Sequence, residues 1–261
     1  ALGGFQLLTP ADDPEAVARL RNRKQRPRKP FAVMVRDLNA AEHISHLDDT
    51  ERRLLTSSEN PIVLVRRQDE RLAENIAPGL DTVGLFLPTT PLHHLILKQF
   101  GRPVVATSGN NRDEPLMIEE NEAIVSLAGI GDAFLIHDRP IVRRLDDSVV
   151  RVIDGEALTM RLGRGYAPLP LPAIEEIARR ASLPPIVATG AHLKSALAVW
   201  TGSQAILGAH IGDLDSPATR KAFLEMSATF DSSTVFSRLR LLAISTRIIS
   251  RRAGPTSNTC R

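Results

Sequence analysis

Cysteine is almost absent from the sequence. The single cysteine, Cys260, is the second residue from the end, so neither a disulfide framework nor a cysteine-based metal cluster is available. Thiol chemistry is therefore excluded from any reaction of this chain. Aromatic residues are also scarce, at 4% against 43% hydrophobic residues in a chain of 261. This length allows one full hydrophobic core and part of a second.

Long apolar runs and a secretory leader are missing as well. No run approaches the ~20 apolar residues that a helix needs to cross a bilayer. The first residues contain neither the basic nor the apolar region of a signal peptide. Charged residues make up 24% of the chain, which is usual for globular proteins in water. We therefore expect a cytoplasmic protein that does not bind membranes.

The positive charge is concentrated at one end of the chain. Residues 230–261 contain six arginines and one aspartate, so the net charge of +3 for the whole chain leaves residues 1–229 with −2. The pI of about 9.4 is a property of the whole chain and does not describe the first 229 residues. Binding to a polyanion must then be argued from local clusters of basic residues.

Short apolar runs alternate with helical patterns over the first part of the chain. The apolar runs predict strands at 31–35, 61–65, 83–87, 103–106 and 133–136. Helical spacing predicts helices at 14–23, 91–99 and 119–127. Residues 148–153 and 157–161 flank Asp154-Gly155, which is typical of a hairpin. The pattern predicts an α/β fold, with a twisted mixed sheet covered by helices.

A second region follows the hairpin. Pro168, Pro170 and Pro172 interrupt the pattern, so we assign residues 1–170 to a first domain and 171–184 to a linker. Residues 185–189, 196–200 and 205–207 are predicted strands, and residues 217–226 a helix. Residues 185–229 are therefore predicted to begin a second domain.

A cluster of seven basic residues lies between Arg19 and Lys29. Such a run is usually a solvated face. Here Pro27 and Pro30 stiffen the turn, which would hold Lys24, Arg26 and Lys29 towards one point. From the residues alone, a solvated face and an anion site both stay open.

The tetrapeptide Thr107-Ser108-Gly109-Asn110 follows the predicted strand at 103–106. Ligands of open α/β sheets bind at the carboxyl ends of strands. A hydroxyl, an amide and unhindered backbone N–H groups suit phosphates and carboxylates. The alternative is an ordinary turn, since Ser, Gly and Asn all favour turns.

A third polar segment precedes the hairpin. Residues 139–148 combine three arginines, among them Arg143, with Asp146, Asp147 and Ser148. A salt-bridge network is the default interpretation, and a triphosphate clamp with Asp146 or Asp147 holding magnesium is the alternative. Arg161 and Arg164 would extend this clamp. By contrast, adjacent residues do not share a helix face, so His93-His94 are interpreted as structural.

These pieces in this order resemble the YrdC-like family of ATP-dependent adenylating domains, from about Gly3 to Pro168. The family's Lys-x-Arg signature corresponds to Lys24 and Arg26, and its Ser-x-Asn signature to Ser108 and Asn110. Arg161 corresponds to an arginine that the family uses near the α-phosphate. The resemblance also implies an association with double-stranded RNA.

Longer segments are similar to a narrower group, the HypF-type carbamoyltransferases of hydrogenase maturation. The segments that carry this similarity are Gly3-Gly4-Phe5, 29–34, 88–93, 139–148 and 164–168. Beyond them, residues 190–195 and 210–214 look like the opening of that family's carbamoyl-transfer domain, which is of the actin-like ATPase type. There, the lysine matching Lys194 lies near nucleotide phosphates.

The resemblance implies a function. Carbamoyl phosphate is hydrolysed to carbamate, which attacks the α-phosphate of ATP to give carbamoyl adenylate and pyrophosphate. The carbamoyl group then passes to a cysteine of a HypE-type acceptor protein, for nickel-iron hydrogenases. Magnesium is expected as cofactor.

The resemblance also implies residue roles. It assigns charge neutralisation to Lys24 and Arg26, and nucleotide or carbamoyl binding to a further set. That set is Lys29, Thr107, Ser108, Asn110, Arg143, Ser148, Arg161 and Lys194.

Two departures from the family stand out. The lysine that precedes the Gly-Gly-Phe segment, the strand leading into it and the upstream acylphosphatase and zinc modules have no counterpart, so zinc is expected only in those modules. After about Met226 the motif resemblance stops. Read from the second base of each codon, residues 244–254 correspond to D-L-H-P-D-Y-L-S-T-R-W, a segment typical of the family.

We therefore expect a frameshift near Thr229 or Phe230, with residues 230–261 as a tail that has no evolved structure. The fragment then lacks the full reaction. Two other functions stay open at this point, namely a double-stranded RNA-binding module and an inert remnant. The charge of −2 over residues 1–229 disfavours RNA.

Overall fold

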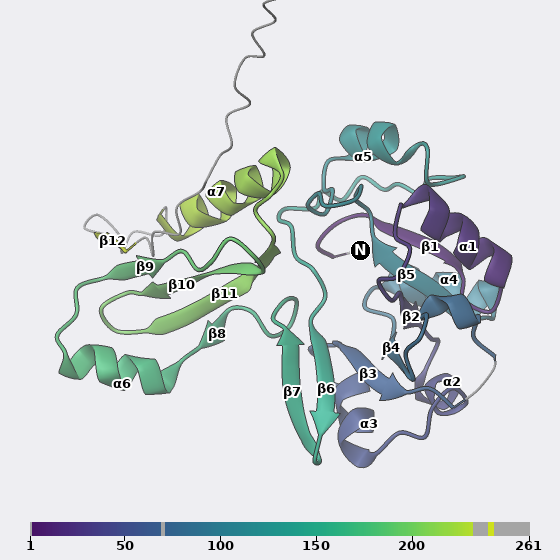
Figure 1. The fold of residues 1–261 in the computed structure, drawn as a ribbon, viewed down its shortest axis with the longest axis horizontal. Coiled ribbons are helices and arrows are strands. Elements are labelled where there is room, and N and C mark those ends of the chain that lie inside the picture. The colour runs from purple at the N-terminus through teal and green to yellow at the C-terminus, as the bar shows by residue number, and fades with distance from the viewer. Residues whose placement is uncertain (1, 69–70, 232–239, 243–261) are drawn as a thin grey trace, which may run out of the picture.

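The computed structural model describes residues 2–68, 71–231 and 240–242. Figure 1 shows two sheets side by side, joined by the chain that follows β7. Among the described helices, none combines the length and the apolar content that crossing a bilayer requires. The predicted α/β class is confirmed, with one mixed sheet in the first domain and a second, smaller sheet in the region that follows it in the chain.

The first sheet is mixed and has seven strands in the order β1-β5-β2-β4-β3-β6-β7. Their bounds are β1 Gln6–Pro10, β2 Ala32–Met34, β3 Ile62–Arg66, β4 Thr82–Phe86, β5 Val104–Ser108, β6 Val149–Ile153 and β7 Glu156–Arg161. β2 runs parallel to β4, and β3 to β6, while the other pairs are antiparallel. The predicted hairpin is confirmed as β6 and β7.

Helices cover both faces of this sheet, because successive side chains along each strand point to opposite faces and apolar side chains occur on both. Val33 and Val35 belong to the larger core, and Met34 packs with Leu97 on the opposite face. The helical elements are α1 Pro14–Arg23, α2 Leu38–Glu42, α3 Asp49–Leu55, the 3-10 turn η1 Glu74–Ile76, α4 Pro91–Phe100 and α5 Glu120–Leu127. The three predicted helices are confirmed as α1, α4 and α5.

The strand predicted at 133–136 is wrong. These residues form no strand, and Leu135 and Ile136 are 66% and 46% exposed. They face β1 across a hollow of about 610 Å³. An apolar run becomes a strand only where a neighbour supplies hydrogen bonds and a packed surface. Among the described residues, no strand pairs with this segment.

The predicted linker at 171–184 is largely a helix. α6 Pro172–Arg180 begins at a proline, which is favourable at the first helical position. Ala178 of this helix packs against Trp200. The prolines therefore mark the beginning of an element and not a flexible connection.

The second sheet has the order β12-β9-β10-β11-β8. Its elements are β8 Leu169–Pro170, β9 Ile186–Ala188, β10 Ser195–Trp200, β11 Ala205–Gly212, α7 Pro217–Asp231 and β12 Arg240–Leu242. α6 and α7 lie on opposite sides of this sheet (Figure 1). Leu197 and Val199 belong to the cluster that includes Phe223 of α7, whereas Trp200 belongs to the α6 side. The predicted strands and helix of this region are confirmed.

Most of the predicted frameshifted tail lies outside the described residues. The described parts of 230–261 are the end of α7 and β12, and β12 pairs in parallel with β9. The three residues of β12 form a strand, and the expectation that the tail has no evolved structure stays a prediction. The frameshift itself stays a prediction.

Two glycines of the first domain, Gly165 and Gly155, give a matched test of close packing. Gly165 has φ +82, and a Cβ there would lie 2.5 Å from the Glu59 carbonyl oxygen, whereas Gly155 has φ +79 with open space around it. We expect Gly155→Ala to cost about 1 kcal/mol from backbone strain alone. Gly165→Ala should cost roughly 2 kcal/mol more, as measured by urea unfolding. Equal losses would contradict this account of the turn.

Candidate functional site

A cleft of about 700 Å³ lies between the two sheets. Its first wall comes from the segment before β2, the end of β5 and the end of β7. Its second wall comes from β11 and the loops that flank it and β10. The backbone N–H of His210 donates to the Leu162 carbonyl at 2.8 Å and ties the walls together. The cleft is therefore a property of both domains.

The turn at the end of β5 is held by a buried lysine. Lys24 is 5% exposed, and its Nζ donates to the carbonyl oxygens of Ser108 and Asn110 and to Asn110 Oδ1, each at 2.7 Å. Ser108 Oγ donates to the same Oδ1 at 2.6 Å, and Asn110 Nδ2 donates to the Glu114 carbonyl. All three ammonium protons are thereby used within the protein.

The environment of Lys24 opposes its charge. Burial, followed by the charges of Arg26 and Lys29, lowers the pKa of Lys24 to about 7. Its three oxygen acceptors favour the ammonium form. Lys24 does not line the cleft. The structure thus brings the two predicted signatures together, but in this arrangement Lys24 positions the turn and does not face a ligand.

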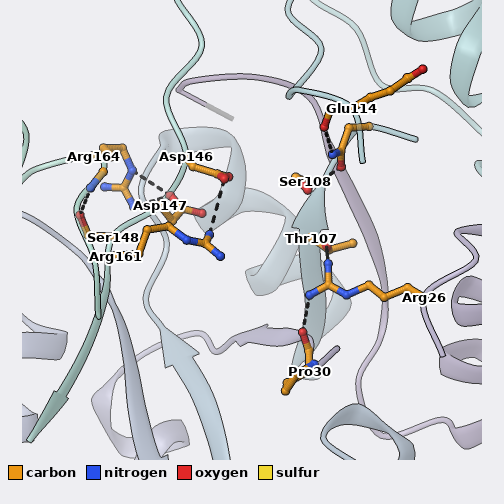
Figure 2. A network of polar contacts seen from close by, with 12 residues as sticks. Arg26, Pro30, Thr107, Ser108, Glu114, Asp146, Asp147, Ser148, Arg161 and Arg164 are labelled. Carbon is orange, nitrogen blue, oxygen red and sulfur yellow. Dashed lines mark hydrogen bonds and ion pairs between the residues drawn. The ribbon is translucent and has the colours of Figure 1, made fainter. Parts of the chain in front are cut away.

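Arg26 lines the cleft beside this turn. Its Nη1 donates to Thr107 Oγ1 at 3.0 Å, and its Nη2 donates to the Pro30 carbonyl (Figure 2). The guanidinium lies 4.8 Å from the ring centroid of Phe31, a cation–π distance. Burial, then Arg21 and Arg161, lowers the pKa of Arg26 to about 10, so it stays charged at neutral pH.

Arg21 binds the backbone of this basic turn, and it was not among the residues predicted from the sequence. Arg21 is 6% exposed and donates to the carbonyls of Arg26 and Lys29 at 2.8 and 3.1 Å. Its guanidinium lies 4.5 Å from the ring centroid of Phe31, the ring that Arg26 also contacts. The spacing of Arg21 on the buried face of α1 was the available signal.

Lys29 and Arg161 bring further positive charge to the cleft. Desolvation at the cleft wall, with Arg26 and Arg161 nearby, lowers the pKa of Lys29. Arg161 Nη1 lies 3.5 Å from Asp146 Oδ2 (Figure 2). After burial, the charge of Arg161 contributes to the lowered pKa values of both Arg26 and Lys29, so these three cations lie close together, and such a cluster favours an anionic group.

The carboxylates at this site have different roles. Asp147 is paired with Arg164, which also donates to the carbonyls of Glu59 and Asn60 at 3.1 and 2.8 Å. Burial raises the pKa of Asp147 against the effect of Arg164. Both Asp146 and Asp147 line the cleft, but the Asp146 side chain is 41% exposed and the Asp147 side chain 22%. Asp146 is therefore the better placed of the two predicted magnesium ligands.

Two predicted nucleotide-binding residues do not line the cleft. Ser148 is fully buried, and its Oγ accepts the Gly163 backbone N–H at 2.8 Å, so it joins β6 to the turn after β7. Arg143 is exposed and is absent from the cleft wall. The binding roles that the resemblance implies for these two residues therefore have no support from the lining of this cleft.

Lys194 lies in the second wall of the same cleft. Its backbone has φ 50, and its N–H donates to Asp213 Oδ1 at 2.6 Å. The resemblance implies only that this lysine lies near nucleotide phosphates. The structure puts it in one cavity with Arg161, together with His210 and Asp213, which the sequence analysis had quoted only as parts of a motif.

The histidine pair of α4 lies away from the cleft. His93 is 4% exposed, with its Nδ1 3.1 Å from Thr89 Oγ1. Burial is the main cause that lowers the pKa of His93 to about 4. Within the described residues, no group of three or more His, Cys, Asp or Glu side chains is arranged to hold a metal ion. Magnesium held by one carboxylate and ligand phosphates does not need such a group.

Comparison with known families agrees with the two-domain arrangement. The Sua5/YciO/YrdC family model, described as telomere recombination, matches residues 1–163. The model for the HypF Kae1-like domain matches residues 181–243. The second match continues past Met226, where the motif resemblance was expected to stop.

Curated relatives cover most of this chain. It is 42% identical over 243 residues to the carbamoyltransferase HypF of Synechocystis, which is 93% of this chain. It is 44% identical over 231 residues to HypF of Rhodobacter capsulatus, which is 88% of this chain. The chain spans only 31% and 30% of the length of these relatives.

Solved structures give the same grouping. Full-length HypF in a phosphate- and nucleotide-bound form matches with TM-score 0.81 and 38% identity, over 88% of this chain and 30% of that one. HypF of T. kodakarensis matches with TM-score 0.83 and 31% identity, over 93% and 31%. Sua5 of P. abyssi in complex with L-threonine, at 20% identity and TM-score 0.56 over 67% of this chain and 51% of that one, shares the fold of the first domain.

The fold and the cleft thus define an α/β domain of the YrdC type, and the chain belongs to the Sua5/YciO/YrdC family. A Kae1-like domain follows it, as in HypF proteins. The predicted resemblance to the HypF carbamoyltransferases is confirmed.

Proposed function

We propose that the cleft forms carbamoyl adenylate from carbamate and ATP, as one step of an ATP-dependent carbamoyl transfer in hydrogenase maturation. The observation that carries this proposal is that Arg26, Lys29 and Arg161 line one cleft together with Ser108 and Asn110. A similar HypF structure in a phosphate- and nucleotide-bound form supports it.

The chemistry requires two anions to meet. A carbamate oxygen attacks the α-phosphorus of ATP, one P–O bond forms, and the bond to the β-phosphate breaks with its electron pair leaving on pyrophosphate. Fixed cations lower the repulsion between the reactants and stabilise the charge on the leaving group. Lys29 and Arg161 supply this charge in the proposed mechanism, and Arg26 contributes from beside Thr107.

The Ser108–Asn110 turn orients the nucleotide in this proposal, with Lys24 holding the turn in place. Asp146 would hold Mg²⁺ together with ligand phosphates, and the ion would supply further charge neutralisation. Lys194, in the second wall, would bind the nucleotide or the carbamoyl group during its transfer. We propose a HypE-type protein with a cysteine thiol as the acceptor.

A long polyanion fits this cleft less well than a nucleotide. Among the described residues, six carboxylates line the same cavity as the cations, namely Asp113, Glu114, Asp146, Asp147, Asp213 and Asp215. These carboxylates would repel the continuous phosphate backbone of a duplex RNA. The mixed lining therefore favours a small ligand over the RNA-binding alternative.

Pyrophosphate release from ATP in the presence of carbamoyl phosphate or ammonium bicarbonate tests the proposal. We expect Arg161→Ala to lower the rate by about 100-fold, in line with the loss of one preorganised donor to a developing charge. Arg151→Ala, which changes an exposed arginine on β6, is the matched control and should keep the parent rate. A parent chain that binds no ATP would overturn the proposal.

A further inference from the structure

His210 lies at an irregularity of the second sheet. Along the β10–β11 pair, Ala196 is opposite His210 and Ala198 is opposite Leu207. Two steps on β10 therefore correspond to three on β11, which is a β-bulge. Bulges change the direction of a side chain and are frequent next to active sites.

This bulge directs the backbone of His210 to the other domain. Its N–H donates to the carbonyl of Leu162, the residue that follows Arg161, at 2.8 Å. Both His210 and Arg161 line the cleft. The bond fixes the position of the His210 backbone relative to that of Arg161, because it joins the two segments directly.

The charged groups around His210 come from both domains. They are Arg161, Asp146 and Lys29 from the first and Asp213 from the second. Burial, followed by the charge of Arg161, lowers the pKa of His210 below its ordinary value of 6.5. The ring is then neutral at pH 7, with one nitrogen that donates and one that accepts. Within the described residues, it makes no hydrogen bond to another protein group.

A carbamoyl group needs such a partner. Its NH₂ requires an acceptor, which Lys29 and Arg161 cannot provide because ammonium and guanidinium groups only donate. The carboxylates of Asp146 and Asp213 accept, but they repel an anionic carbamate. Asn110 Oδ1 is already engaged by Lys24 and Ser108. A neutral imidazole accepts without repulsion.

We propose that His210, supplied by the second domain, contacts the carbamoyl group in the cleft and selects it. This inference rests on the proposed function and adds a specificity residue to it. It makes the docked second domain part of the substrate site, so that nucleotide binding and carbamoyl recognition are divided between the two walls.

The experiment uses the full 261-residue chain and measures two affinities by calorimetry. The first is for α,β-methylene-ATP, in which the bond to be broken is blocked, and the second is for carbamoyl phosphate added to that complex. We expect His210→Ala to weaken carbamoyl phosphate binding by about tenfold, the effect of one hydrogen bond to a polar ligand. The affinity for the nucleotide analogue should stay within about twofold of the parent value.

A conservative variant and a spectroscopic signal separate contact from structural damage. His210→Gln keeps a donor and an acceptor and should recover part of the binding, whereas His94→Gln, at an exposed position of α4, should match the parent. In NMR spectra, the imidazole signal that His210→Gln removes should shift when carbamoyl phosphate is added.

The outcomes distinguish the two proposals. If the parent binds both probes and His210→Ala binds them equally well, the role of His210 is refuted and the proposed function stands. If the parent binds neither probe, the proposed function fails and the inference fails with it. A folded His210→Ala chain that loses the nucleotide analogue as well would also overturn the selection of the carbamoyl group.

Discussion

Lys24→Met should cost about 3 kcal/mol of stability and lower ATP affinity by at least about tenfold. The three oxygens that Lys24 Nζ satisfies at 2.7 Å would lose their donor inside the protein. Asn110 would then no longer be fixed, and its side chain would cease to anchor Ser108. Urea unfolding and calorimetric ATP binding measure the two losses.

The matched control is Lys98→Met, at an exposed position of α4, which should change neither quantity. The family resemblance gives Lys24 a direct role in neutralising the reactants, and the two roles have different signatures. A Lys24→Met chain with parent stability and ATP affinity but without pyrophosphate release would show that Lys24 acts on the substrate and would refute the positioning role.

Arg164→Leu should destabilise the first domain by about 3–5 kcal/mol, the usual cost of removing one partner of a buried ion pair. Asp147 would remain inside without its counter-ion. The carbonyls of Glu59 and Asn60, which Arg164 also satisfies, would lose a donor. Asp147 lines the cleft beside Asp146, so the loss of its counter-ion should lower ATP affinity as well.

This loss should depend on pH. Burial already raises the pKa of Asp147 above its ordinary value of 3.8, and without Arg164 the pKa would rise further. Between the pKa of Asp147 in the unfolded chain and its higher pKa in the native state, the native state keeps a proton that the unfolded chain has released. Stability therefore falls as pH rises through this range. The destabilisation by Arg164→Leu should therefore be smaller near about pH 4.5 than near about pH 7.5, as measured by urea unfolding at both.

A double variant provides the control for this pair. Asp147→Leu together with Arg164→Leu removes both charges and should be more stable than Arg164→Leu alone, since no buried charge is left unpaired. A penalty for Arg164→Leu that is equal at both pH values and unrelieved in the double variant would show that packing, and not the ion pair, explains the loss.

The helices of this chain can be predicted from the sequence where local spacing and a capping residue are sufficient to define them. α1 was predictable from Val17 and Leu20 after Asp13, whose side chain caps the helix. α3 was not predicted, although Asp48 and Glu51 form a capping box, a signal available in the sequence. The strand expected at 133–136 failed because pairing depends on a neighbour that local sequence does not reveal.

The site residues divide in the same way. The Lys-x-Arg and Ser-x-Asn signatures could be recognised in the sequence, and Arg26, Lys29, Ser108, Asn110 and Arg161 do line one cleft. Local sequence cannot show which face of the chain a side chain takes in a segment without periodicity. For that reason Ser148 and Arg143 were grouped with the cleft, although one is buried and the other exposed outside it.

The sequence by itself determined the α/β class, the order of the two domains, the family and the two polar signatures, because each depends on residue type and spacing along the chain. Only the tertiary structure decided that Lys24 donates to the turn after β5, that Lys194 and His210 line one cleft with Arg161, and that Asp146 is more exposed than Asp147. Each depends on contacts between segments far apart in sequence, such as Lys24 with the turn after β5 and His210 of β11 with the end of β7.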